Sequence, residues 1–186
     1  MSSGVERRRR AGQHAREQAR ARSWLRFFGG SFKRSFSTWS QGAEGEEVVG
    51  QLLEELATSG WYALHDVSFG RGNIDHVVVG PGGLFTIETK SHRGKVFISS
   101  LDQKMLGQAY AEKKTLETVT GMPVRSLLVF SQAYLVGRVP AYSRGVTILP
   151  ARMLTGFLSR QKQAMSAEEA AAIYGRLAPA VGQAVV

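Results

Sequence analysis

Hydrophobic and polar residues follow two different periods along this chain, and the change of period separates predicted helices from predicted strands. Apolar positions recur at helical spacing over residues 43–58 and again over 101–119. Short apolar runs bounded by Gly, Pro or polar residues predict strands around the second helix. These predicted strands cover residues 60–67, 73–80, 84–90, 95–98, 126–130 and 146–149.

The C-terminal part is predicted to be helical. One helix is expected over residues 150–159, and a capping box at residues 166–169 opens another that runs towards Ala178. The continuous apolar runs at 126–130 and 146–149 are typical of central strands. The order helix, strands, helix, strands, helices predicts an α/β domain in which a small central mixed β-sheet is flanked by helices.

Residues 1–40 differ from the rest of the chain in composition and charge. Residues 1–34 contain ten Lys or Arg against two acids, which accounts for +8 of the total net charge of +9. The remaining residues are therefore close to neutral. The sequence predicts a near-neutral domain over residues 41–186 that carries a basic, aromatic arm over residues 1–40, helical or disordered in part.

Three roles are open for this arm. It could be a solvated basic tail, or its run Arg7, Arg8, Arg9 and Arg10 could contact a nucleic-acid backbone. Aromatic residues interleaved with basic ones between Trp24 and Trp39 would also suit peripheral contact with an anionic membrane surface.

Composition excludes several classes of site. The chain contains no cysteine, so disulfides, zinc ribbons and thiol catalysis are excluded, and a reducing cytoplasm is the expected location. No apolar run approaches the roughly 20 residues that a membrane-spanning helix needs. The basic N-terminus lacks the apolar core of a signal peptide.

Two carboxylates and a lysine stand out in the predicted hairpin over residues 73–90. A hairpin symmetric about Pro81–Gly82 places Asp75 opposite Glu88, with Cβ atoms roughly 5 Å apart. Lys90 follows Glu88 by two residues and so returns to the same face. Pro-Gly favours a type II turn, which suits a tight hairpin poorly, so we expect a longer loop with the same symmetry.

This arrangement indicates either a cation site or a surface ion pair. Two carboxylates that face each other repel, which favours a cation between them. An ordinary salt bridge of Lys90 with Glu88 is the alternative. Both strands are largely apolar, as expected for strands buried on both faces, and charges at the ends of such strands are unfavourable unless paired or metal-bound.

Polar residues also occupy the apolar faces of the two predicted helices. Glu46 extends the stripe of the first helix and is expected to point inward, whereas Glu47 lies on the polar face. In the second helix, Gln108 and Glu112 lie on the apolar face, either at its edge or directed at a site. His76 is expected to face away from Asp75, because neighbours on a strand alternate faces.

The apolar stripe of the first predicted helix consists of Val48, Val49, Leu52, Leu53 and Leu56.

Across residues 41–155 the chain resembles the nuclease-related domain, NERD, of the PD-(D/E)XK nuclease-like superfamily. The segments that carry the resemblance are Gly42–Glu46, Gly60–Trp61, Gly72–Pro81, Phe85–Lys90, Gln108 and Pro123.

The resemblance implies a restriction-endonuclease-like fold and roles for five residues. Asp75 and Glu88 would be metal ligands, Lys90 the catalytic lysine, Glu46 the first-helix acid and a further ligand, and Gln108 a supporting glutamine. The expected function is Mg²⁺- or Mn²⁺-dependent hydrolysis of phosphodiester bonds, with DNA favoured over RNA.

Two other roles stay open at this point. One is a catalytically silent nucleic-acid-binding or scaffold module, and the other is a membrane-surface interaction protein that acts through the arm. Arg71 and Lys95, on either side of the hairpin, are further candidate contacts for nucleic acid.

Overall fold

The computed structural model describes residues 39–69 and 72–181, with side chains from residue 44 onward. The arm and its Arg7–Arg10 run lie outside the described residues, as does Arg71. The predictions of nucleic-acid contact and membrane contact at those positions therefore stay predictions. None of the helices in the described part of the chain is both long enough and apolar enough to cross a bilayer.

A six-stranded mixed sheet forms the centre of the domain, in the order β1-β2-β3-β5-β8-β7. The strands β1, β2 and β3 are antiparallel, β3, β5 and β8 are parallel, and β7 pairs antiparallel at the edge. Their bounds are β1 Tyr62–Ser68, β2 Asn73–Gly80, β3 Gly83–Lys90, β5 Val124–Phe130, β7 Ala141–Ser143 and β8 Val146–Pro150. The predicted mixed sheet is confirmed.

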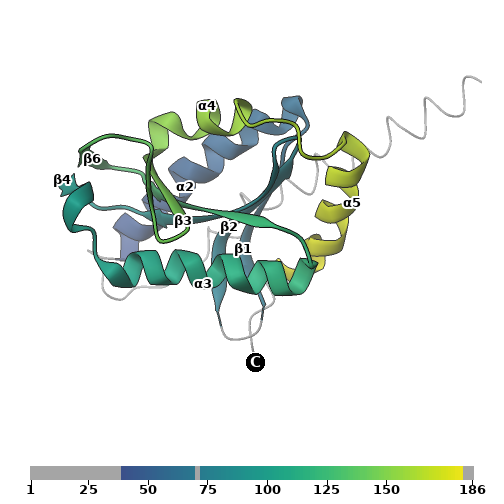
Figure 1. Cartoon of the computed structure of the whole chain (residues 1–186), viewed down its shortest axis with the longest axis horizontal. Coiled ribbons are helices and arrows are strands. Elements are labelled where there is room, and N and C mark those ends of the chain that lie inside the picture. The colour runs from purple at the N-terminus through teal and green to yellow at the C-terminus, as the bar shows by residue number, and fades with distance from the viewer. Residues whose placement is uncertain (1–38, 70–71, 182–186) are drawn as a thin grey trace, which may run out of the picture. The chain divides into compact units, whose positions relative to one another are not determined.

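Helices cover both faces of this sheet (Figure 1). On one face α2 and α4 share a hydrophobic core with the sheet, and α3 packs on the other face. The last helix, α5, packs beside β1 and β2. The bounds are α2 Trp39–Glu54, α3 Gln103–Thr120, α4 Leu154–Ser159 and α5 Ala167–Leu177. Short 3-10 helices cover Glu55–Ser59, Ile98–Ser100, Ala151–Met153 and Ala178–Ala180.

The alternation of side chains along β3 determines which helix faces the carboxylate of Glu88. Phe85 and Ile87 pack in the core on the side of α2 and α4. Leu84 packs with Leu116 of α3 on the opposite side. Because side chains alternate faces along a strand, the carboxylate of Glu88 lies on the α3 side of the sheet.

Two hydrophobic positions in the predicted helical stripes lie outside the core. Val48 of α2 and Val119 of α3 are exposed. The core contact runs through Val49 and Leu53 of α2 and Leu56 of the following 3-10 helix, at steps of four and three residues. Val48 precedes this row by one residue, which turns it by about 100° away from the sheet.

The turn between β2 and β3 is tighter than the sequence predicts. Gly80 pairs with Gly83, so only Pro81 and Gly82 form the loop, and the expectation of a longer loop is wrong. The positive φ of 113° lies at Gly83 rather than at Gly82, where a type II turn would require it. Tertiary contacts hold this turn: the Pro81 carbonyl accepts the Ala164 N–H at 2.7 Å.

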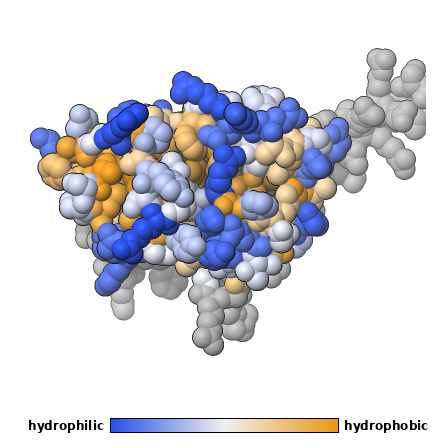
Figure 2. All heavy atoms as spheres, in the orientation of Figure 1, coloured by the Kyte–Doolittle hydropathy of each residue, from blue (hydrophilic) through white to orange (hydrophobic). Residues whose placement is uncertain are grey.

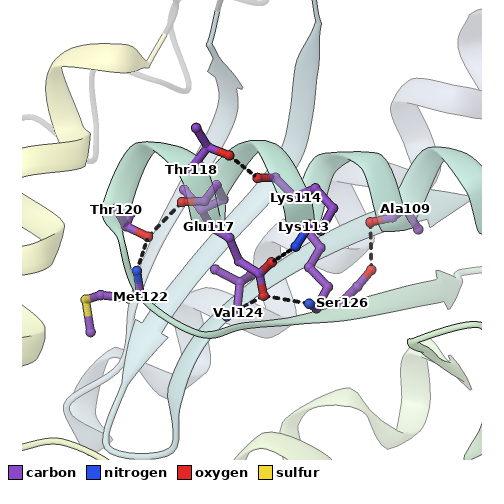
Figure 3. A network of polar contacts seen from close by, with 10 residues as sticks. Ala109, Lys113, Lys114, Glu117, Thr118, Thr120, Met122, Val124 and Ser126 are labelled. Carbon is purple, nitrogen blue, oxygen red and sulfur yellow. Dashed lines mark hydrogen bonds and ion pairs between the residues drawn. The ribbon is translucent and has the colours of Figure 1, made fainter.

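A polar network fixes α3 against the start of β5 (Figure 3). Glu117 accepts hydrogen bonds within α3 from Lys113 at 2.6 Å and Lys114 at 2.8 Å, and from the backbone N–H of Val124 in β5 at 3.4 Å. Further along β5, the buried Ser126 hydroxyl donates to the carbonyl of Ala109 at 2.9 Å. The bonds to Val124 and Ser126 set the position of α3 along the sheet.

A second, two-stranded parallel sheet lies beyond the ends of β3 and β5. It consists of β4 (Gly94–Phe97) and β6 (Ala133–Val136). The strand predicted over residues 95–98 is therefore present but stands outside the main sheet. Neither β6 nor β7 is predicted from the sequence, because the two strands are only four and three residues long.

Candidate active site

Asp75 and Glu88 come together through the register of the β2–β3 hairpin. The pairs run without a break from Gly80–Gly83 to His76–Ile87, and the same register continued by one step sets Asp75 opposite Glu88. The Asp75 carboxylate accepts a hydrogen bond of 2.8 Å from the backbone N–H of Thr89. Asp75 is half-buried, whereas Glu88 is only 2% exposed.

Lys90 neutralises part of this negative charge. Its ammonium group forms an ion pair with Oε1 of Glu88. Oε2 of the same carboxylate is buried and has no hydrogen-bond partner among the described residues. The predicted association of Asp75, Glu88 and Lys90 is therefore present, with one buried oxygen of Glu88 left unsatisfied.

A third acid, Glu112 of α3, lies against this pair. It is 8% exposed, and while it is ionised neither of its carboxylate oxygens has a hydrogen-bond partner in the described part of the chain. The pKa of Glu112 is raised to about 9, by burial first and then by the neighbouring Glu88. Two ionised carboxylates cannot donate to each other, so Glu112 and Glu88 can hydrogen-bond only with a proton between them.

The pKa of Asp75 is also raised, to about 7. Burial is the largest cause and the charge of Glu88 the second, while the hydrogen bond from Thr89 opposes both. Three acids thus share this end of the sheet with one lysine. Without a further cation, the cluster retains protons near neutral pH.

Glu46 lies at the exposed side of the cluster instead of pointing into the core. Its pKa is raised by partial burial first and by Glu88 second, which places its carboxylate within electrostatic reach of the site. The adjacent Gly45 explains this approach. A Cβ on Gly45 would come within 2.7 Å of Ser131 Oγ and of Ser91 Cβ, so α2 at Gly45 lies close to the residues that follow β3 and β5.

Gln108 is exposed on α3, one helical turn before Glu112. Its amide lowers the pKa of Glu112, opposing the effect of burial. The buried polar residue of this helix face is thus Glu112, which sequence reasoning placed on the apolar stripe but did not select as a site residue. Its signal was its spacing, between the buried Ala109 and Leu116.

The histidines stand apart from the acids. His76 is buried, and its Nδ1 lies 2.7 Å from Nδ1 of His65 on the paired strand. At this distance one ring donates and the other accepts, so the two rings hold different tautomers. His65 lies under α2, because a Cβ on Gly50 would stand 3.6 Å from its ring. The pair belongs to the α2 side of the sheet.

The donors at the acidic cluster suit a hard divalent cation. Over residues 44–69 and 72–181, no three His, Asp or Glu side chains already converge as a complete metal site. Mg²⁺, however, is commonly held by one or two carboxylates, with water and substrate phosphates completing its coordination. Asp75 and Glu88 supply such a pair, and the unsatisfied oxygen of Glu88 is the place where a positive charge is missing.

Comparisons with known proteins agree with this arrangement. Residues 41–131 match the family described as nuclease-related domain. An uncharacterized protein of Bacillus anthracis is 28% identical over 90 residues, which cover 46% of this chain and 42% of that protein. The matched region is thus less than half of the relative's length.

Two solved structures resemble the chain more loosely. One is a repair endonuclease from Pyrococcus abyssi, with a TM-score of 0.37 and 15% identity over 74% of this chain and 50% of that one. The other is EndoMS in complex with double-stranded DNA, with a TM-score of 0.36 and 14% identity over 73% and 48%. Scores of this size carry no argument about the family. The likeness to the nuclease-related domain is carried by the match over residues 41–131.

Proposed function

We propose that this chain is a nuclease that hydrolyses phosphodiester bonds of DNA and depends on Mg²⁺ or Mn²⁺. The observation that carries the proposal is the cluster of the half-buried Asp75 with the buried Glu88 and Glu112, with Lys90 at its side. Such an excess of buried acid is unfavourable for stability unless a bound cation offsets it. The match to the nuclease-related domain supports the same reading.

Asp75 and Glu88 would hold the cation, and Glu46 is near enough to bind one of its waters. A bound Mg²⁺ or Mn²⁺ would supply Lewis acidity, lowering the pKa of a bound water and offsetting charge on the phosphate. Lys90 forms an ion pair with Glu88 at the edge of the cluster. We assign it to stabilising negative charge on the phosphate rather than to accepting a proton.

Glu112 and Gln108 would act through Glu88. A protonated Glu112 can donate to the oxygen of Glu88 and so hold that carboxylate in one orientation. Gln108 sits on the solvent side of Glu112, where its amide can orient the same group. Both are positioning residues.

The test is cleavage of single- and double-stranded DNA and RNA by the full chain with Mg²⁺, with Mn²⁺ or with EDTA. Cleavage should require the metal and should fall by about 100-fold or more in Glu88→Gln and Lys90→Met. The matched controls are Glu47→Gln, next to Glu46 on the exposed side of α2, and Lys104→Met on α3.

Two outcomes would overturn the proposal. Cleavage that survives unchanged in Glu88→Gln and Lys90→Met would show a contaminating nuclease. Nucleic-acid binding without turnover in any metal would instead favour the silent binding module.

A further inference from the structure

The small β4–β6 sheet presents an aromatic and basic face to solvent. One face of this sheet is in the core, where Val96 and Leu135 pack under α3. The other face carries Lys95, Phe97 and Tyr134. All three are exposed, Phe97 by 51% and Tyr134 by 61%. We call these three residues the platform.

The register of the two strands brings the platform residues together. Lys95 pairs with Tyr134, and Phe97 follows Lys95 by two residues on the same face. Paired residues of parallel strands lie side by side. The diagonal from Phe97 to Tyr134 is about 8 Å between Cα atoms, from the ordinary strand spacing and rise. Two rings and one ammonium group therefore occupy a single small surface.

The segments that build the platform carry only positive charges, of which Arg93 pairs with Glu44 of α2 at 3.6 Å. The segments 91–101 and 131–150, which build the small sheet and its surroundings, contain four Lys or Arg and no Asp or Glu. The four are Arg93, Lys95, Arg138 and Arg144. Figure 2 shows hydrophobic residues gathered at the end of the molecule where Figure 1 places β4 and β6, with hydrophilic residues around them.

The platform also lies near the acidic cluster. β4 begins four residues after Lys90, and β6 begins three residues after Phe130, the partner of Lys90 in the main sheet. Lys95 follows Lys90 by five positions, a span of at most about 18 Å. A nucleic-acid strand bound at the platform can therefore reach the acidic cluster within a few nucleotides.

We propose that the platform binds an unpaired segment of nucleic acid, with bases stacked on Phe97 and Tyr134 and a phosphate beside Lys95. This deepens the proposed function by naming its substrate class, and it rests on that function for the idea that the bound strand is also cut. Exposed rings can stack only on bases that have left the duplex, whereas a basic surface attracts any polyanion. The combination favours strands with single-stranded regions.

The experiment is fluorescence anisotropy with a labelled oligothymidylate of about 12 nucleotides, using the full chain in EDTA. Phe97→Leu and Tyr134→Leu keep apolar bulk but remove the ring, and each should weaken binding about 10-fold. Lys95→Met should lower the salt dependence of log K by about 0.7. The matched control is Tyr142→Leu, an exposed tyrosine of β7, which should bind as the unaltered chain does.

A duplex of the same length and an oligouridylate complete the comparison. The duplex should bind more weakly and should be insensitive to loss of either ring, and the oligouridylate distinguishes RNA from DNA. The basic arm is the same in every variant, so differences among variants report the platform. Photo-crosslinking of a 5-iodouracil oligonucleotide should label Phe97 or Tyr134.

The platform is refuted if the ring variants bind as well as the Tyr142→Leu control, or if crosslinks fall elsewhere. It is also refuted if the unaltered chain prefers the duplex. Because binding is measured in EDTA, the result does not depend on catalysis. Ring-dependent binding without any metal-dependent cleavage would overturn the nuclease proposal alone.

Discussion

The Asp75 carboxylate accepts a hydrogen bond of 2.8 Å from the backbone N–H of Thr89, the residue between Glu88 and Lys90. The acid of β2 is thus held by the main chain of the strand that carries the other two charged groups. Because the donor is a backbone group, the link does not depend on the side chain at position 89. The Asp75 side chain therefore has two separable roles. It accepts the hydrogen bond that holds the end of the hairpin, and it carries negative charge at the site.

Asp75→Asn and Asp75→Ala should separate these duties. The asparagine keeps an oxygen that can accept from Thr89, whereas the alanine leaves a buried N–H without a partner, at a cost of about 1–3 kcal/mol. We expect both variants to lose cleavage by about 100-fold or more, with only the alanine less stable than the unaltered chain. Urea denaturation in EDTA and the cleavage assay check the two expectations. Equal stability of the two variants would contradict a structural role for the hydrogen bond.

The acidic cluster should make the metal-free protein less stable as pH rises. The pKa of Glu112 in the folded state is raised from 4.5 to about 9, and that of Asp75 from 3.8 to about 7. The folded state therefore binds more protons, and this stability is full at low pH and is lost as pH rises through the folded pKa values. His65 and His76 have lowered pKa values and act in the opposite sense below about pH 6.5. The free energy of unfolding in EDTA should therefore fall most clearly between about pH 7 and pH 9.

Glu112→Gln should reduce the loss of unfolding free energy that accompanies rising pH. The amide keeps the size of the side chain and its ability to donate to Glu88, but it does not ionise. Above neutral pH the variant should therefore be more stable than the unaltered chain in EDTA. Glu47→Gln, an exposed change on α2, should leave the slope unaltered. Parallel slopes for all three proteins would show that Glu112 does not titrate in this range.

Added Mg²⁺ should stabilise the folded chain through Asp75 and Glu88. At a free concentration of 100 times its Kd, a ligand that binds only the folded state adds about 2.7 kcal/mol. The gain should be larger at pH 8 than at pH 6, because the cation competes with protons for the same carboxylates. Thermal melting with and without Mg²⁺ measures it. An equal gain in Glu88→Gln would place the cation elsewhere.

Gly45 should not tolerate a side chain. A Cβ there would stand 2.7 Å from Ser131 Oγ and Ser91 Cβ, so Gly45→Ala should cost about 1–3 kcal/mol and move Glu46 from the site. Gly107→Ala is the matched control, because a Cβ at this helical position of α3 meets nothing within 4 Å. It should stabilise the chain by about 0.5–1 kcal/mol. The denaturant midpoints of the two variants, compared with that of the unaltered chain, measure these changes in stability.

Patterns within one element carried most of the fold prediction. The hairpin register follows from the symmetry of the two strands about Pro81–Gly82, and that register already sets Asp75 opposite Glu88. The capping box at Ser166 and Glu169 is likewise present in the structure. These features depend on neighbours along the chain or across one strand pair, which are visible in the sequence.

Features that depend on packing between distant segments were missed. The tight β2–β3 turn is held by the carbonyl of Pro81, which binds the chain after α4. Glu112 enters the site because the bonds from Ser126 to Ala109 and from the Val124 N–H to Glu117 fix the position of α3 along the sheet. The periodicity of a helix gives its face, but it does not give the helix position relative to a sheet.

The sequence by itself determined the mixed sheet, the hairpin register and the association of Asp75 with Glu88 and Lys90, because each follows from local periodicity. Only the tertiary structure decided that Glu112 completes the acidic cluster, that Glu46 stays at its exposed side and that β4 and β6 form a separate sheet. These depend on distances between segments far apart in the chain, which are set by packing around a shared core and by no pattern within any one segment.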